Sequence, residues 1–135
     1  MGTRHLADTN VIIDLVTGRL PLAATDWLEA QLNQNAVVIS VVTRIELLTK
    51  TEPAAEYATM QDFVRNVDVL PLDEMVVAQT IALRQRHRVK LPDAIIAATA
   101  LAHGLALVSR NGKDFAGVVG LAVVNPHDAA TLPTL

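Results

Sequence analysis

Four carboxylate side chains, widely separated in the sequence, could together form a metal-binding site. They are Asp8, Glu46, Asp93 and Asp114. Clustered carboxylates repel one another and raise each other's pKa values, so a fold keeps such a cluster only when something neutralises it. Hard divalent cations such as Mg²⁺ do so through oxygen ligands. Two such ions can activate water and stabilise the leaving oxygen of a phosphodiester, so this set of residues indicates metal-dependent hydrolysis.

The first two acids each have a simpler structural explanation. Asp8 could cap the helix that follows it, although Thr9 and Asn10 can also cap a helix and make Asp8 unnecessary for that role. Glu46 could pair with Lys50, at the i,i+4 spacing that slightly stabilises a helix. Glu46 also lies at the margin of an apolar helix face, where a partly buried carboxylate is costly unless it is paired or liganded.

The other two acids also have ordinary interpretations. Asp93 follows Pro92, and proline at the first helical position followed by an acid suits the helix dipole. Asp114 falls in the turn-prone stretch NGKD and could be a simple loop acid. No single acid is decisive, so the prediction of a site depends on all four being brought together.

The elements that would position these acids alternate between apolar β-like segments and helical patterns. Strands are expected at about 5–8, 36–40, 67–72, 105–109 and 121–125. Helices are expected at about 11–16, 23–33, 43–50, 53–66, 73–88 and 91–103.

The order of these elements predicts a parallel α/β sheet with helices on both faces. Several strands are continuous apolar runs, which is typical of a sheet that is covered on both sides. In such sheets ligands bind beyond the carboxyl ends of the strands. All four acids are expected at that edge.

Composition supports one packed enzyme-sized domain, which we place at residues 1–135. The chain is 51% apolar and 19% charged, and it has no cysteine, so neither a disulfide nor a thiolate zinc site can form. The first residues lack the apolar core of a signal peptide. No apolar stretch reaches the roughly 18 residues that cross a bilayer. We therefore expect a cytoplasmic protein without a membrane partner.

The total charge and the aromatic content alone argue against a nucleic-acid partner. The formal net charge is −3, whereas nucleic-acid binding usually shows a basic footprint. Four aromatic residues of the Phe, Trp and Tyr types are too few for a base-stacking platform. Without the four acids of the expected site, however, the formal net charge becomes +1.

Basic residues lie beside the expected site. Residues 84–90, RQRHRVK, come immediately before Asp93, and two more cations flank the approach to Asp114. Such a run could be an ordinary solvated helix end. Its functional interpretation is a guide for the phosphate backbone. The candidate phosphate-backbone-binding residues are Arg84, Arg86, Arg88, Lys90, Arg110 and Lys113.

Four segments together resemble the PIN-domain ribonucleases, specifically the VapC-type toxins of toxin–antitoxin systems. The segments are LADTNVIIDL, VVTRIELL, LPDAIIAATALAHGLALVSRN and KDF, and the resemblance extends from about Leu6 to Val124. It implies a three-layer α/β/α domain with a parallel sheet of about five strands. It also implies cleavage of RNA by an endonuclease that depends on Mg²⁺ or Mn²⁺.

The resemblance also assigns roles to residues and names partners. Asp8 and Asp93 correspond to metal ligands, and Glu46 and Asp114 complete the site directly or through water. An antitoxin and a second copy of the chain are the implied partners besides RNA, and the alanine-rich stretch 94–102 would permit close helix packing in a homodimer. Supporting polar residues are Thr9, Ser109 and Asn111.

Two other classes of protein also place an aspartate after the first strand. Haloacid-dehalogenase-like phosphatases carry a D-x-D pattern after this strand. In this chain the pattern would start at Asp8, but its third residue is Asn10. Receiver-like signalling modules pair adjacent acids, whereas Asp8 is followed by Thr9. A non-catalytic acidic α/β interaction module is the main alternative to a nuclease.

Overall fold

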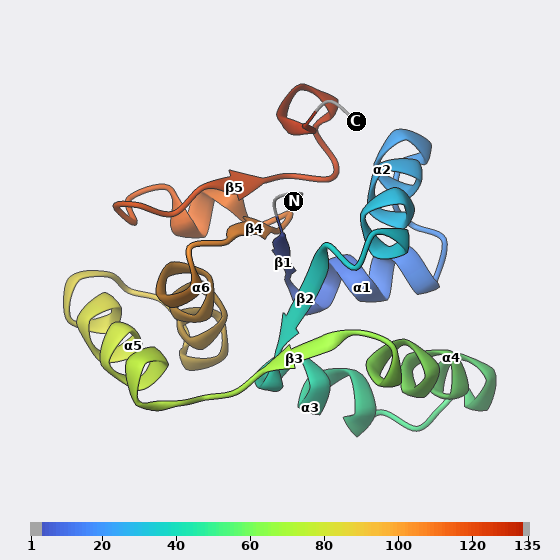
Figure 1. Cartoon of the computed structure of the whole chain (residues 1–135), viewed down its shortest axis with the longest axis horizontal. Coiled ribbons are helices and arrows are strands. Elements are labelled where there is room, and N and C mark those ends of the chain that lie inside the picture. Colours follow the sequence, from blue (N-terminus) through green and yellow to red (C-terminus); the bar gives the residue numbers. More distant parts are fainter. Residues whose placement is uncertain (1–3, 134–135) are drawn as a thin grey trace.

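The computed structural model describes residues 4–133 and centres on a parallel sheet (Figure 1). The strand order is β3-β2-β1-β4-β5, and every neighbouring pair is parallel. The first and last few residues of the predicted domain 1–135 lie outside the described part. The strands are β1 His5–Ala7, β2 Val37–Ser40, β3 Asp68–Leu70, β4 Ala106–Val108 and β5 Val123–Val124.

The helices confirm the predicted alternation, with ends within a few residues of those expected. Local signals set several of these ends: the Asp73 side chain caps the fifth helix, and Gly104 ends the sixth with a left-handed φ of 63°. The α-helices are α1 Thr9–Val16, α2 Leu22–Asn33, α3 Val41–Thr49, α4 Ala54–Arg65, α5 Glu74–Arg86 and α6 Leu91–His103. Two short 3-10 helices follow, η1 Gly112–Phe115 and η2 Ala129–Thr131.

Side chains that alternate along each strand divide the core between the two faces of the sheet. In β1, Leu6 packs with the core of α5 and α6, whereas Ala7 packs with α1, α2 and α4. Leu107 and Val108 of β4 divide in the same way. Figure 1 shows α5 and α6 on one side of the sheet and α1, α2 and α4 on the other. The three-layer α/β/α fold is therefore confirmed.

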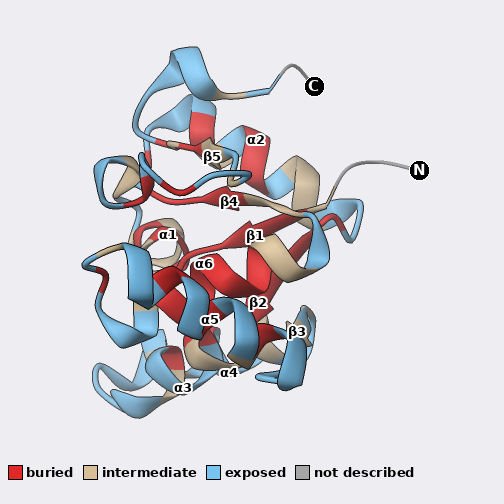
Figure 2. Cartoon of the chain, turned by 90° about the vertical axis from the view of Figure 1, so that its left-hand side faces the viewer, coloured by how far each residue is buried: buried red, intermediate tan, exposed pale blue. Residues whose placement is uncertain are grey.

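The alanine-rich stretch 94–102 is not the dimer surface that was expected. Residues 94–100 are all buried, because α6 is packed between the sheet and α5 (Figure 2). Small side chains allow α5 to approach this closely, and α5 and α6 form the most extensive helix pair of the described chain. The small residues serve packing within one chain.

The strand order also defines where a ligand would bind. The chain moves from β1 to β2 and β3 on one side, and returns to β4 and β5 on the other. Connections after β1 and β4 therefore diverge, which opens a crevice at the carboxyl ends of these strands. Among the helices of residues 4–133, none is long and apolar enough to cross a membrane.

Candidate active site

Asp8 lies at the carboxyl end of the central strand and is held by two hydrogen bonds. Its exposed fraction is 3%. Its Oδ1 accepts a hydrogen bond from the Thr9 backbone N–H at 2.7 Å, and its Oδ2 accepts one from the Ser109 hydroxyl at 2.9 Å. Asp8 is thus the N-cap of α1, contrary to the expectation that Thr9 or Asn10 would make it unnecessary for capping. Capping uses one oxygen, so the carboxylate can serve both the helix and a ligand.

Thr9 connects Glu46 to this strand end. The Thr9 hydroxyl donates to Glu46 Oε1 at 2.6 Å and also lies 2.9 Å from the Thr43 hydroxyl. Glu46 is exposed, so the expectation that it would be partly buried is wrong. The ion pairs of residues 4–133 do not include Glu46 with Lys50, because Glu46 is turned toward Thr9.

Asp93 and Asp114 complete an acidic region at this edge of the sheet. Burial raises the pKa of Asp93, and the negative charges of Glu46 and Asp114 raise it further against a smaller opposing effect of Lys90. Burial also raises the pKa of Asp8, where the hydrogen bonds from Ser109 and Thr9 oppose it and the charges of Asp93 and Glu46 add to it. These charge effects link Asp8 with Asp93 and Glu46, and Asp93 with Glu46 and Asp114.

These carboxylates are neighbours, but they do not form a closed ligand shell. Within residues 4–133, no three acidic or histidine side chains are arranged to hold one metal ion together. Even so, the donors are all oxygens, and burial, reinforced by the negative charges of neighbouring acids, raises the pKa values of Asp8 and Asp93. A hard divalent cation fits such a donor set. It would neutralise the negative charges, and it binds oxygen ligands either directly or through its own water molecules.

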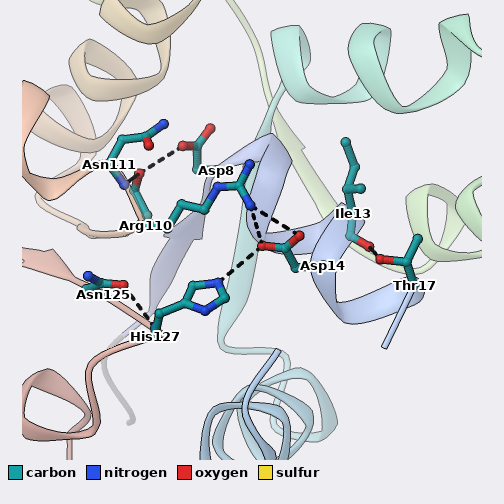
Figure 3. A network of polar contacts seen from close by, with 9 residues as sticks. Asp8, Ile13, Asp14, Thr17, Arg110, Asn111, Asn125 and His127 are labelled. Atoms are coloured by element: carbon teal, nitrogen blue, oxygen red, sulfur yellow. Dashed lines mark hydrogen bonds and ion pairs between the residues drawn. The ribbon is translucent and has the colours of Figure 1, made fainter. Parts of the chain in front are cut away.

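A buried network missed by the sequence analysis supports the β4 side of the site. Asp14 of α1 is 2% exposed and binds a guanidinium and an imidazole from distant segments. Its Oδ2 lies 3.1 Å from Arg110 Nη1 and 3.3 Å from His127 Nε2. Figure 3 shows Arg110 reaching the Asp14 carboxylate from above and His127 reaching it from below. Arg110, expected to bind RNA, is thus engaged with Asp14.

The residues on either side of Arg110 contact the acidic region directly. Ser109 donates to Asp8, and the Asn111 backbone N–H donates to the Ser109 hydroxyl at 3.1 Å. The Asn111 carbonyl accepts from the Asp114 N–H at 3.0 Å, which starts the turn carrying Asp114. Anchoring Arg110 to Asp14 therefore fixes the backbone that presents both Ser109 and Asp114.

The predicted basic run, residues 84–90, lies just before the start of α6, and one of its arginines is already hydrogen-bonded within the chain. Arg84 Nε donates to the Val89 carbonyl at 3.2 Å and so holds the turn between α5 and α6. Arg86, Arg88 and Lys90 are exposed. Lys90 is also close enough to Asp93 to influence its pKa. The run therefore borders the acidic region.

Ser109→Ala should weaken both the fold and the ionised form of Asp8. Removing the hydroxyl leaves a buried carboxylate oxygen without its donor, at a cost of about 1 kcal/mol in the free energy of unfolding. The pKa of Asp8 should rise further, because this hydrogen bond is the largest influence that lowers it. Urea denaturation at neutral pH measures the cost. Thr59→Val, which removes an exposed hydroxyl bonded within α4, is the control and should cost less than about 0.5 kcal/mol.

The chain is similar to one protein family and to a characterised member of it. Residues 6–121 match the family described as PIN domain. The tRNA(fMet)-specific endonuclease VapC of Shigella flexneri is 31% identical over 127 residues, covering 87% of this chain and 94% of that protein.

Solved structures agree with this match. A chain of a toxin–antitoxin complex from Klebsiella pneumoniae is 34% identical, with a TM-score of 0.73 and coverage of 92% of this chain and 98% of that chain. A chain of the DNA-bound VapBC complex from Salmonella typhimurium has a TM-score of 0.78 at 23% identity, covering 93% and 99%, and supports the fold alone.

Proposed function

Because this chain belongs to the PIN-domain family, we propose that it is a metal-dependent endoribonuclease acting as the toxin of a toxin–antitoxin pair. The observation that carries the proposal is the acidic region at the carboxyl edge of the sheet, where the charges of Asp93 and Glu46 act on Asp8, and those of Glu46 and Asp114 act on Asp93. Mutual repulsion of this kind lowers the stability of the folded protein unless a bound cation neutralises the charges. The match to the PIN-domain family argues against the receiver-like and phosphatase alternatives.

We assign Asp8 and Asp93 as direct ligands of Mg²⁺ or Mn²⁺, with Glu46 and Asp114 acting directly or through water. Bound divalent ions would supply activation of a water molecule and stabilisation of the leaving oxygen. The chain contributes orientation: the Thr9 N–H and the Ser109 hydroxyl fix the two oxygens of Asp8. The Thr9 hydroxyl directs Glu46 toward the same strand end.

Asn111 and the cations around the acidic region help to position the RNA substrate. The Asn111 backbone holds the turn of Asp114, while its side chain lies beside the site. Arg86, Arg88, Lys90 and Lys113 are exposed and free to meet phosphates. Phosphate contacts of this kind position a nucleic acid without reading its sequence.

The partners follow from the relatives. Structures similar to this chain are toxin–antitoxin complexes, some of them bound to DNA. We propose that a small cognate antitoxin restrains this chain, that the chain forms a homodimer, and that it acts in the cytoplasm as one domain spanning residues 1–135. The Shigella flexneri relative is named for tRNA(fMet), so initiator tRNA is the first defined substrate to test.

The direct test is cleavage of total RNA and of initiator tRNA by the purified chain. Reactions with Mg²⁺, with Mn²⁺ and with EDTA are compared, and the new RNA ends are mapped. Defined internal cuts with either metal, and none with EDTA, support the proposal. Uncut RNA under all metal conditions would contradict it.

Replacing Arg86 and Arg88 together by alanine should weaken RNA binding most strongly at low salt. Each phosphate contact with single-stranded nucleic acid contributes about 0.7 to the slope of log affinity against log salt, so losing two contacts should reduce that slope by about 1.4. Arg84 is left intact, because it holds the Val89 carbonyl.

Binding of fluorescent RNA in EDTA over a series of salt concentrations measures the slope. The matched control replaces Arg19 and Arg65 by alanine and so removes the same charge. Arg19 is exposed between α1 and α2, and Arg65 is exposed at the end of α4. Equal slopes for both double variants would mean that the run is only a solvated surface.

A further inference from the structure

A groove lined by several polar and charged residues continues from the acidic region toward the C-terminal segment. It has a volume of about 540 Å³, and its two walls are residues 110–114 and residues within 123–131. Asp114 lines one wall, so the groove begins at the candidate active site. An RNA strand positioned for cleavage must extend on both sides of the cut, so a groove that begins at Asp114 can receive the nucleotide next to it.

Buried Asp14 holds the two walls together. It binds Arg110 from the first wall and His127 from the second (Figure 3). The second wall is stiffened internally, since the Thr131 hydroxyl accepts from the Asn125 N–H at 2.9 Å and donates to the Asn125 carbonyl. The groove is therefore preformed, which lowers the entropic cost of binding.

Two side chains of the second wall retain unused hydrogen-bonding groups. Asn125 Oδ1 accepts from the His127 N–H at 2.9 Å, leaving its amide NH₂ free to donate. Asp128 Oδ1 accepts from the Ala130 N–H at 3.0 Å, leaving Oδ2 free to accept. Both side chains line the groove. One wall thus presents a donor and an acceptor whose positions are set by bonds to the backbone.

Lys113 and Asp128 divide the groove chemically. Lys113 suits a phosphate, whereas the Asp128 carboxylate repels phosphate and suits the amino or imino hydrogens of a base. Aromatic stacking is not available in the groove, because Trp27 and Phe115 are buried and Tyr57 and Phe63 lie on α4. Single-stranded RNA is otherwise recognised through hydrogen bonds to the edges of splayed-out bases.

We propose that this groove is a base-reading subsite for one nucleotide next to the cut. Asn125 and Asp128 recognise the edge of the base, and Lys113 holds its phosphate. Because a carboxylate can accept from both the N1–H and the N2 amino group of guanine, whereas uracil offers only its N3–H, the subsite favours guanine over uracil. The inference rests on the proposed ribonuclease function and adds the origin of its sequence preference.

The test uses two substitutions that preserve the bonds within the wall. Asp128→Asn keeps an oxygen for the Ala130 N–H, and Asn125→Asp keeps one for the His127 N–H. Each changes only the group that faces the groove, and the double variant keeps the net charge of the wild type. Asp26→Asn and Asn33→Asp, both exposed on α2, make the same changes of charge outside the groove.

Each enzyme is incubated with Mg²⁺ and a library of single-stranded RNAs randomised around one cut, and the ends are sequenced. For the groove variants, discrimination against uracil at one position beside the cut should fall by about tenfold, while the α2 controls keep the wild-type preference. Unchanged preferences in active groove variants overturn the subsite alone. A uniform loss over all sequences also overturns it, because the groove would then bind only backbone. Failure of the wild type to cut any RNA overturns the proposed function as well.

Discussion

Asp8→Asn should reduce the rate of RNA cleavage by at least about a thousandfold, the effect expected when several kcal/mol of metal-assisted stabilisation are lost. Asp8 is the most buried of the four acids, and both of its oxygens are fixed by hydrogen bonds. Asparagine keeps an acceptor for the Thr9 N–H, so α1 remains capped. Only the charge and one oxygen of the candidate ligand are lost.

Cleavage of initiator tRNA by Asp8→Asn and wild type at equal concentration measures this effect. Far-ultraviolet circular dichroism and thermal denaturation establish that the variant is folded. Asp26→Asn removes a carboxylate of the same type from the exposed surface of α2 and should retain full activity. Cleavage by folded Asp8→Asn within tenfold of the wild type would exclude Asp8 as an essential ligand.

Asp93→Asn should abolish most of the activity and yet stabilise the metal-free protein. Burial and the charges of Glu46 and Asp114 raise the pKa of Asp93 in the folded state, so its ionised form is disfavoured by folding. A carboxyl whose pKa is raised on folding contributes stability below its unfolded pKa and loses that contribution as pH rises through its folded pKa. The stability advantage of asparagine should therefore grow as pH increases over the range above about 4.

Thermal denaturation in EDTA at a series of pH values tests this prediction, and a second series contains Mg²⁺. The wild type should gain more stability from Mg²⁺ than the variant does, because the variant lacks one ligand oxygen and one charge. Glu74→Gln, at the first turn of α5, is a control for an acid that favours only the helix dipole. An Asp93→Asn variant that is less stable than the wild type by the same amount with and without Mg²⁺ would identify Asp93 as a helix-dipole residue only.

The strands and helices could be predicted because their signals are local. A capping aspartate at position 73 and a glycine at position 104 mark helix ends within a few residues. Continuous apolar runs such as 36–39 indicate a sheet covered on both faces, which the two cores confirm. The expectation that the four acids lie at one edge of the sheet followed from one rule, that the carboxyl ends of parallel strands meet there.

The interactions that organise the site could not be predicted, because they join residues remote in sequence. Asp14 reads as an ordinary residue of α1, and its partners Arg110 and His127 lie 96 and 113 residues away. Thr9 binds Glu46 across 37 residues. Nothing in the local pattern distinguishes such residues from a helix cap or a surface cation.

The failed expectation for residues 94–102 has a related cause. A stretch of small apolar residues indicates close packing but not the identity of what packs against it. In this chain the partner is α5, which comes directly before α6. Exposure of Glu46 was misjudged for the same reason, since the margin of a helix face is defined by its neighbours.

The hydrogen bond between Ser109 and Asp8 spans 101 residues, and it has a consequence for the cell that makes the protein. A chain still being synthesised presents β1 early, but Asp8 has no Ser109 and no Asp114 until β4 and the turn after it have emerged. Contacts of such long range form late in folding. A ribosome that stalls before residue 109 therefore releases a fragment in which Asp8 lacks this donor, and under the proposed function such a fragment has no complete active site.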